Sequence, residues 1–277
     1  MDLMQINGVR LEFQRIAAAG GRPAAPLIFL HEGLGSVAMW RDWPSSVCSA
    51  TGREGIVYSR RGYGGSDAVP DVRGGGRLAP DYMHREAFEV LPALLRALNV
   101  QAPVLLGHSD GGSIALLHAS RHPVSACIVM APHVIVEDLS VASITEARAA
   151  YQSGALRERL ARYHADVDGA FWQWNDIWLN PAFRAFDIRP DCRRIEAPVL
   201  AIQGEDDPYG TLRQIDEIAP TRGRFQREVL AGCGHSPHRD QPEATTRLIV
   251  EFLQSAPSLT PRTRLLPTAA DQVRHDT

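Results

Sequence analysis

Lysine is absent from this chain of 277 residues, so arginine supplies all 29 of its basic side chains. We interpret this absence as a bias of genome composition and not as a functional feature. Acidic residues number 32 and the formal net charge is only −3, so neither sign of charge dominates. Binding to nucleic acid or to an anionic membrane surface needs an excess of basic charge. The sequence therefore predicts no nucleic-acid partner and no membrane partner.

Cysteine and long apolar runs are also scarce. The four cysteines lie far apart, without metal-ligand spacing, and a chain of this length needs no disulfide framework: Cys48, Cys127, Cys192 and Cys233. No apolar run reaches the roughly 18 residues of a membrane span. The first residues, MDLMQINGVR, lack the layout of a signal peptide. We therefore expect a cytoplasmic protein without a metal site.

The residues that are present form an ordinary globular composition, with 44% hydrophobic and 22% charged side chains. Short apolar runs alternate with segments of helical spacing. The runs predict strands at residues 11–17, 26–30, 55–58, 103–106, 126–130, 198–202 and 227–230. Strands that alternate with helices predict an α/β fold, with a mostly parallel sheet and helices on both of its faces.

One long segment interrupts this alternation. Residues 135–190 are mostly helical in character and show little strand signal, which predicts a small helical cap over one end of the sheet. The core then comprises residues 1–134 and 191–254. Residues 255–277 contain three prolines and many polar side chains, and we expect a poorly ordered or loosely docked tail. Ligands of such sheets bind outside the carboxyl ends of the strands.

Residues 107–111, GHSDG, follow a predicted strand and precede a predicted helix. A sharp strand-to-helix turn brings backbone segments close together, so it needs small residues two positions before and two positions after its serine. Such a turn would lift the Ser109 hydroxyl above the sheet as a nucleophile. The alternative is a glycine-rich turn with an incidental serine.

Residues 31–36, HEGLGS, directly follow the predicted strand PLIFL. A serine hydrolase needs two backbone N–H donors for the oxyanion of its tetrahedral intermediate. The residue after the nucleophile, Asp110, would supply one donor. Gly33 would supply the other, with Leu34 as the second choice. The alternative is a glycine loop that is shaped only for packing.

An acid and a base also follow strands. Three adjacent acids end the segment GEDD at residues 204–207, and a carboxylate there could orient a catalytic histidine. Because side chains alternate in direction, the three cannot all point inward. Residues 234–238, GHSPH, follow the last predicted strand. His235 comes first after the glycine and is the better candidate for a general base, whereas we expect His238 to be structural or at the surface.

Together these motifs resemble the α/β-hydrolase fold superfamily over residues 11–253. HEGLGS looks like its oxyanion loop, RRGYGGSD at residues 60–67 like its rGyGxS loop, GHSDGG like its nucleophile elbow and CGHSPH like its histidine loop. The family usually places its triad aspartate three residues after the strand-end glycine, which selects Asp207. The segment 135–190 looks like the cap of small-molecule esterases, enol-lactonases and carbon–carbon bond hydrolases.

The resemblance implies a site. Its catalytic residues would be Ser109 as nucleophile, His235 as base and Asp207 as the orienting acid, with no metal and no organic cofactor. The backbone N–H groups of Gly33 and Asp110 would form the oxyanion hole.

Two residues depart from the family pattern. Glu32 stands where the family often has glycine, and Asp110 stands where an apolar or amide side chain is commoner. Carboxylates near an oxyanion are unfavourable unless they are paired or turned away. A nearby arginine, such as Arg60 or Arg61, could pair with either. A serine at the elbow also argues against the dehalogenase and epoxide-hydrolase branches, which use aspartate.

The predicted cap is aromatic, with Phe171, Trp172, Trp174, Trp178, Phe183 and Phe186. Trp174 and Trp178 are four residues apart and share one helix face. We expect most of these rings to attach the cap to the core. One or two would line an apolar pocket. The predicted substrate pocket comprises Leu34, His133, Trp172 and Trp174.

Three functions remain open. The first is hydrolysis of a small carboxylic ester, thioester or lactone through an acyl-enzyme on Ser109. The second is cleavage of a carbon–carbon bond in a ring-fission type diketone by the same triad. The third is a ligand-binding member of the fold without catalysis. We expect a small-molecule substrate as the partner of a monomer or homodimer.

Overall fold

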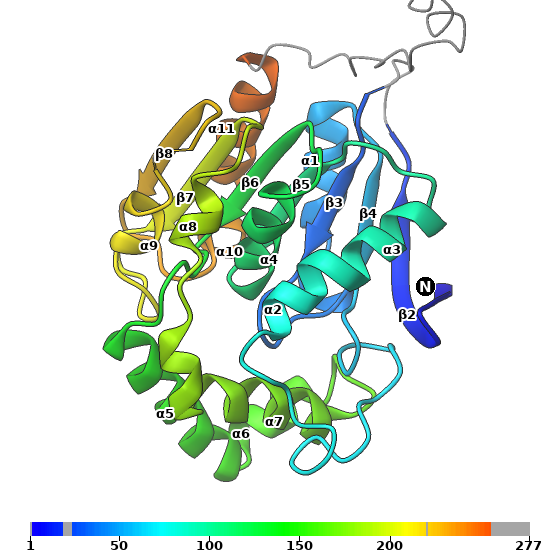
Figure 1. Cartoon of the computed structure of the whole chain (residues 1–277), viewed down its shortest axis with the longest axis vertical. Coiled ribbons are helices and arrows are strands. Elements are labelled where there is room, and N and C mark those ends of the chain that lie inside the picture. The colour runs from blue at the N-terminus through cyan, green and yellow to red at the C-terminus, as the bar shows by residue number, and fades with distance from the viewer. Residues whose placement is uncertain (1, 19–23, 220, 256–277) are drawn as a thin grey trace, which may run out of the picture.

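The computed structural model describes residues 2–18, 24–219 and 221–255, which fold around one eight-stranded sheet (Figure 1). Its order is β1-β2-β4-β3-β5-β6-β7-β8. The strands are β1 (Asp2–Ile6), β2 (Val9–Ile16), β3 (Leu27–Leu30), β4 (Gly55–Tyr58), β5 (Val104–His108), β6 (Ala126–Met130), β7 (Val199–Gly204) and β8 (Phe225–Leu230). The strands from β4 to β8 in this order pair in parallel, so the predicted α/β class is confirmed.

The amino-terminal edge of the sheet differs from our expectation. We predicted one early strand, whereas β1 and β2 form an antiparallel hairpin, and β2 pairs antiparallel with β4. Asn7 and Gly8 connect the hairpin with φ angles of 50° and 81°. An Asn-Gly pair at positive φ is the preferred two-residue hairpin turn, so the sequence carried a signal for β1 that we did not use.

Helices cover both faces of the sheet, as strand β3 illustrates. Leu27 and Phe29 pack with α1 (Trp43–Thr51) and α11 (Pro242–Ser255), whereas Ile28 and Leu30 pack on the opposite face. That opposite face is covered by α2 (Tyr82–Arg85), α3 (Leu91–Ala97) and α4 (Asp110–Ala119). Because both faces are buried, β3 is a continuous apolar run without alternation.

The helical segment between β4 and β5 has three parts. A π-helical turn, η2 (Glu86–Val90), separates α2 from α3. Pro92 lies in the first turn of α3 and cannot donate a backbone hydrogen bond to the preceding turn. The wider π-helical turn before Pro92 compensates for the hydrogen bond that proline cannot donate.

Between β6 and β7 the chain forms helices and no strand of the sheet. They are α5 (Asp138–Gln152), α6 (Ala155–Leu160), α7 (Val167–Trp178), η3 (Pro181–Ala185) and α8 (Arg189–Cys192). Helices α5, α6 and α7 lie together beyond one end of the sheet (Figure 1). A bridge between Ile135 and Asp187 joins the two ends of this segment. The sheet therefore has a helical layer at one end.

His164, between α6 and α7, fastens this layer to two loops. Its Nδ1 accepts from the backbone N–H of Gly64 at 2.9 Å, and its Nε2 donates to the Leu34 carbonyl at 3.0 Å. One side chain thus holds the helical layer against the loops after β3 and β4.

Other parts of the chain bear on the remaining expectations. The predicted tail begins at Ser255, the last residue of α11, and residues 256–277 lie outside the described part. No helix among the described residues is long and apolar enough to cross a membrane.

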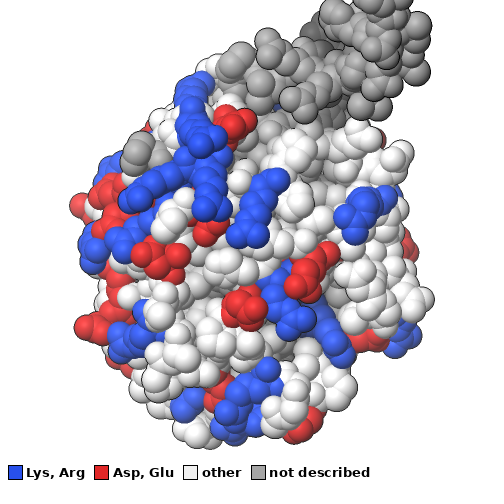
Figure 2. Space-filling model, viewed as in Figure 1, with Lys and Arg blue, Asp and Glu red and all other residues white. Residues whose placement is uncertain are grey.

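All four cysteines are buried and free. Arginine side chains lie beside acidic ones on the face in Figure 2, so the small net charge reflects mixed signs.

Candidate active site

Ser109 occupies a sharp turn between β5 and α4. Its φ of 52° and ψ of −120° are a strained backbone conformation for a residue with a side chain. A Cβ atom at Gly107 would lie 2.2 Å from the Gly111 carbonyl oxygen, and one at Gly111 would lie 2.1 Å from the Leu30 carbonyl oxygen. Both glycines of the motif are therefore required by close backbone approach, as the sequence predicts.

His235 and Asp207 meet Ser109 in one hydrogen-bonded chain. The Ser109 hydroxyl lies 2.9 Å from His235 Nε2, and His235 Nδ1 lies 2.9 Å from both carboxylate oxygens of Asp207. The three residues come from the ends of β5, β8 and β7. Parallel strands bring these ends to one edge of the sheet, which joins residues that are 126 and 28 positions apart.

Asp207 is held by more than the histidine. It accepts from the side-chain amide of Gln203 at 2.9 Å and from the backbone N–H of Tyr209 at 2.8 Å. Burial by itself raises the pKa of this carboxyl, but the hydrogen bond and charge of His235 outweigh burial and lower that pKa below its ordinary value. Asp207 is therefore an ionised acceptor that fixes His235 Nδ1 as the protonated nitrogen.

The loop after β3 places Gly33 beside the serine. A Cβ atom at Gly33 would lie 2.2 Å from Nε1 of Trp174, so only glycine fits under this indole. Gly33, Leu34 and Asp110 all line the same cavity as Ser109. The structure thus brings the predicted oxyanion residues to the predicted nucleophile.

The Asp110 side chain turns away into a buried set of donors. Its carboxylate accepts from the Tyr82 hydroxyl at 2.7 Å and from Trp178 Nε1 at 3.3 Å, and it lies 3.6 Å from the Arg60 guanidinium. Burial raises the pKa of Asp110, and Arg60 opposes that rise. Of the two arginines that we considered, Arg60 is the partner, and Arg61 is exposed.

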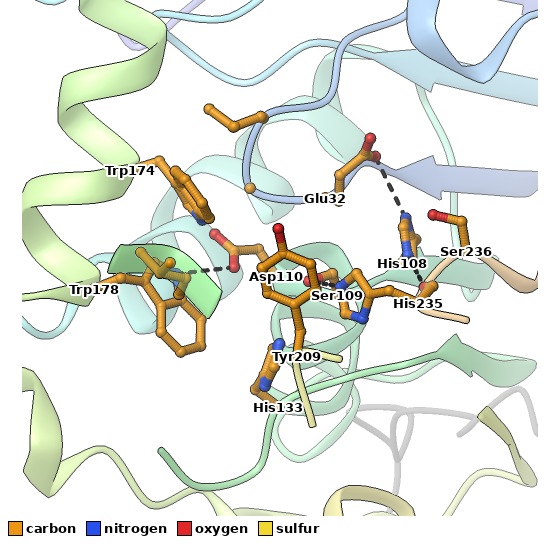
Figure 3. A pocket seen from close by; sticks show the side chains of 13 residues that line it. Glu32, His108, Ser109, Asp110, His133, Trp174, Trp178, Tyr209, His235 and Ser236 are labelled. Carbon is orange, nitrogen blue, oxygen red and sulfur yellow. Dashed lines mark hydrogen bonds and ion pairs between the residues drawn. The ribbon is translucent and has the colours of Figure 1, made fainter. Parts of the chain in front are cut away.

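Glu32 takes a different partner. Its Oε2 lies 3.5 Å from Nδ1 of His108, the residue before the nucleophile, so a histidine and not an arginine faces this carboxylate (Figure 3). Arg60 instead donates to the Glu32 backbone carbonyl at 2.9 Å.

A cavity of about 120 Å³ opens over the serine. It is lined by Glu32, Gly33, Leu34, His108, Ser109, Asp110, His133, Ile144, Trp174, Trp178, Tyr209, His235 and Ser236. Three of the four predicted pocket residues are among them, and Figure 3 shows Trp174, Trp178, His133 and Tyr209 around the opening. Burial lowers the pKa of His133 to about 3, so His133 is a neutral ring.

Trp172, the fourth predicted pocket residue, does not line the cavity. Its ring lies 4.0 Å from the Arg73 guanidinium and packs edge-on against Tyr151. Two residues along an α-helix rotate a side chain by about 200°, so Trp172 and Trp174 face opposite directions. Trp178, four residues after Trp174, is the second cavity tryptophan, and the spacing in the sequence contained that signal.

Four lining residues escaped the sequence reasoning, and one of them is Ile144 on α5. Tyr209 packs over His235 with ring centroids 4.8 Å apart, and only its place two residues after Asp207 could have indicated it. His108 lies inside the serine motif but gave no signal of its own. Ser236 follows His235 directly. His238 is buried against Trp40 and Trp43, with ring centroids 4.8 and 5.3 Å away, which favours the structural alternative that we gave for it.

Comparison with known proteins identifies the family to which the chain belongs. Residues 27–248 match the Alpha/beta hydrolase family. The 2-hydroxymuconate semialdehyde hydrolase of Pseudomonas sp. (strain CF600) is 25% identical over 255 residues, which cover 83% of this chain and 87% of that protein. The serine hydrolase BPHL of Homo sapiens is 25% identical over 210 residues, with 72% of this chain and 69% of that protein covered.

Solved structures show the same fold. The enol-lactonase from Burkholderia xenovorans LB400 superimposes with a TM-score of 0.68 over 91% of this chain and 100% of that chain, at 19% identity. At this level of sequence identity, the similarity shows a shared fold, that is, the same arrangement of the sheet and its helices.

Proposed function

The chain belongs to the alpha/beta hydrolase family, and on this premise we propose that it is a serine hydrolase of small carboxylic esters, thioesters or lactones. The observation that supports this proposal is the hydrogen-bonded chain from Ser109 through His235 to Asp207 at the floor of a cavity. In such a chain the serine is the nucleophile, the histidine is the general base that activates it, and the buried carboxylate orients the histidine.

The proposed reaction begins at Ser109. As its oxygen attacks the acyl carbon, its proton moves to His235 Nε2, 2.9 Å away. Asp207 stabilises the imidazolium that forms. His235 then gives the proton to the leaving oxygen or sulfur, and the acyl group stays on Ser109. Water, deprotonated by His235, releases the acid and restores the serine.

The oxyanion of the tetrahedral intermediate needs donors in place before the reaction. We assign this role to the backbone N–H groups of Gly33 and Asp110, which line the cavity with Ser109. Asp110 donates from its backbone while its carboxylate contacts Tyr82, Trp178 and Arg60. Its negative charge is therefore compensated by these three side chains.

The size of the cavity indicates the substrate class. A volume of about 120 Å³ is well below the roughly 300–1,000 Å³ of a pocket for a drug-sized ligand. Trp174 and Trp178 on α7 and Ile144 on α5 form its apolar side. We therefore propose short acyl groups, of about two to four carbons, as the preferred substrates.

A labelling experiment tests the proposal. A fluorophosphonate probe should label the wild-type protein and should fail to label Ser109→Ala, because the probe reacts with an activated serine. Wild type should also hydrolyse p-nitrophenyl acetate, and Ser109→Ala should not. Equal labelling and equal turnover of both proteins would show that Ser109 is not the nucleophile.

Carbon–carbon bond cleavage is the second candidate. It is favoured by the relative named 2-hydroxymuconate semialdehyde hydrolase, which is similar over 83% of this chain. A ring-fission dienone assayed beside p-nitrophenyl acetate separates the two functions. A kcat/KM for the dienone that exceeds the value for the ester would favour the second candidate.

A further inference from the structure

Glu32 is the side chain that the proposed reaction leaves without a role. It directly precedes Gly33 in the loop after β3, and its carboxylate is directed toward His108 (Figure 3). The Glu32 side chain is 18% exposed, whereas that of His108 is 1% exposed. Because the imidazole is buried, solvent screens its electrostatic interaction with the carboxylate only weakly.

The second nitrogen of His108 fixes where a proton lies. His108 Nε2 is 2.7 Å from the backbone carbonyl oxygen of His235, and a carbonyl can only accept, so Nε2 carries hydrogen. Nδ1 then faces Oε2 of Glu32 at 3.5 Å. The carboxylate of Glu32 is therefore the charged group that lies beside the second ring nitrogen of His108.

The surroundings favour an ionised Glu32. Burial raises the pKa of this carboxyl, but the hydrogen bond and charge of His108 outweigh burial and hold the pKa below its usual range. Glu32 is thus the carboxylate that faces His108, and His108 in turn donates to the His235 backbone.

The partners in this chain of contacts occupy special positions in the sequence. Glu32 precedes Gly33, and His108 precedes Ser109. The accepting carbonyl belongs to His235 itself. The contacts therefore join the loop after β3, the turn after β5 and the loop after β8, each at the functional residue or one residue away.

We propose that Glu32 and His108 form a clamp that holds the His235 loop at hydrogen-bonding distance from Ser109, with Glu32 as a positioning residue. Asp207 orients the ring of His235, and the clamp fixes its backbone, in a loop that spans residues 231–236 between β8 and α10 (Pro237–Asp240). This inference rests on the proposed function. Misplacing a reacting group by about 1 Å costs on the order of 100-fold in rate.

The first test removes the carboxylate. Glu32→Ala should lower kcat for p-nitrophenyl acetate by about 10- to 100-fold and should change KM much less, because the apolar side of the cavity remains while the base is misplaced. A kcat within two-fold of wild type, or a loss that appears only in KM, would overturn the proposal.

A conservative variant keeps the bridge. In Glu32→Gln the side-chain amide can donate to His108 Nδ1, so kcat should recover to within about five-fold of wild type. A Gln variant as impaired as the Ala variant would contradict a role in positioning through this contact. The Gln variant also retains the side-chain volume, so it provides a result if Glu32→Ala does not fold.

Glu12→Ala is the matched control. Glu12 is a buried carboxylate that accepts from the Ser59 hydroxyl at 2.7 Å and from the Gly65 N–H at 3.0 Å, and it does not line the cavity. Its loss should lower the melting temperature and leave kcat unchanged. If Glu12→Ala lowers kcat as much as Glu32→Ala does, the effect of Glu32 is general destabilisation and the clamp is wrong.

A spectroscopic measurement separates the clamp from the reaction. In protein with ¹⁵N-labelled histidine, the His108 signals are identified by their loss in His108→Gln. The His108 Nδ1 signal should shift between wild type and Glu32→Ala, because the substitution removes the carboxylate that lies beside this nitrogen. Identical His108 signals in both proteins would overturn the clamp even if Ser109 is active. A wild type that fluorophosphonate does not label would overturn the proposed function and leave this measurement valid.

Discussion

Two carboxylate–histidine pairs lie side by side at the edge of the sheet, Asp207–His235 and Glu32–His108. In both, a carboxylate contacts Nδ1 and directs Nε2 at an oxygen atom. That oxygen is the Ser109 hydroxyl at 2.9 Å in the first pair and the His235 backbone carbonyl at 2.7 Å in the second. A hydroxyl can give up a proton and a carbonyl cannot. The first pair can therefore take part in proton transfer, whereas the second pair can only hold a backbone group in place.

The exposure of the two pairs is reversed. His235 is 15% exposed and Asp207 is 1% exposed, whereas His108 is 1% exposed and Glu32 is 18% exposed. A histidine that exchanges protons with a substrate must reach the cavity, while a histidine that only holds a loop need not. The same two residue types thus serve different purposes according to which partner is buried.

The largest effect is expected from removing the Ser109 hydroxyl, which distinguishes the first pair from the second. Ser109→Ala should lower kcat for p-nitrophenyl acetate by about 10⁶-fold, because no other atom at the site can form the acyl-enzyme. Ser120→Ala, at the end of α4, is the control and should retain wild-type turnover, because its hydroxyl only donates to the Leu117 carbonyl at 2.7 Å. Appreciable turnover by Ser109→Ala would remove the basis for calling the first pair catalytic.

The second effect addresses the carboxylate of the first pair. Asp207→Asn should lower kcat by about 10⁴-fold, because the amide can donate to Nδ1 and so stabilise the wrong tautomer of His235. The neighbouring, exposed Asp206 provides the control Asp206→Asn, which should behave as wild type. Equal rates for the two variants would mean that Asp207 is not the orienting acid.

Acid should destabilise the protein through buried histidines that the fold keeps neutral, and His118 is one of them. Burial lowers the pKa of His118 to about 4, although its hydrogen bond to the Ala87 carbonyl at 2.9 Å raises it. The unfolded chain binds this proton near pH 6.5, so the contribution of neutral His118 to stability is present above that pH and is lost as pH falls toward 4.

His118→Gln should therefore reduce the acid-induced loss of unfolding free energy by up to about 3 kcal/mol between pH 6.5 and pH 4. Urea unfolding of wild type and variant at several pH values in this window measures the change. Parallel curves for the two proteins would show that His118 is not held neutral by the fold.

The smallest expected effect concerns the cavity wall above both pairs. Trp174→Ala should enlarge the cavity and raise the ratio of kcat/KM for p-nitrophenyl hexanoate over acetate by about ten-fold. Trp172→Ala is the matched control, because Trp172 lies on the same helix without lining the cavity. If both variants change the ratio equally, the acyl group does not lie against Trp174.

Much of the fold could be predicted because its signals are local. Apolar runs marked seven of the strands, and the glycines around Ser109 marked the turn, since both follow from backbone geometry within a few residues. The hairpin strand β1 was missed although its Asn-Gly turn was readable. The choice of Trp172 over Trp178 was an error in applying helical spacing that the sequence could have prevented.

The sequence by itself determined the class of sheet, the sharp turn at Ser109 and the order in which serine, acid and histidine follow strands. Only the tertiary structure decided the partners of the two unexpected carboxylates. Asp110 meets Tyr82 and Trp178, which are 28 and 68 residues away, and Glu32 meets His108 where the neighbouring strands β3 and β5 end. The reason is physical: a backbone turn depends on neighbouring residues, whereas the pairing of a buried charge depends on which distant donors the packed strands bring within about 4 Å.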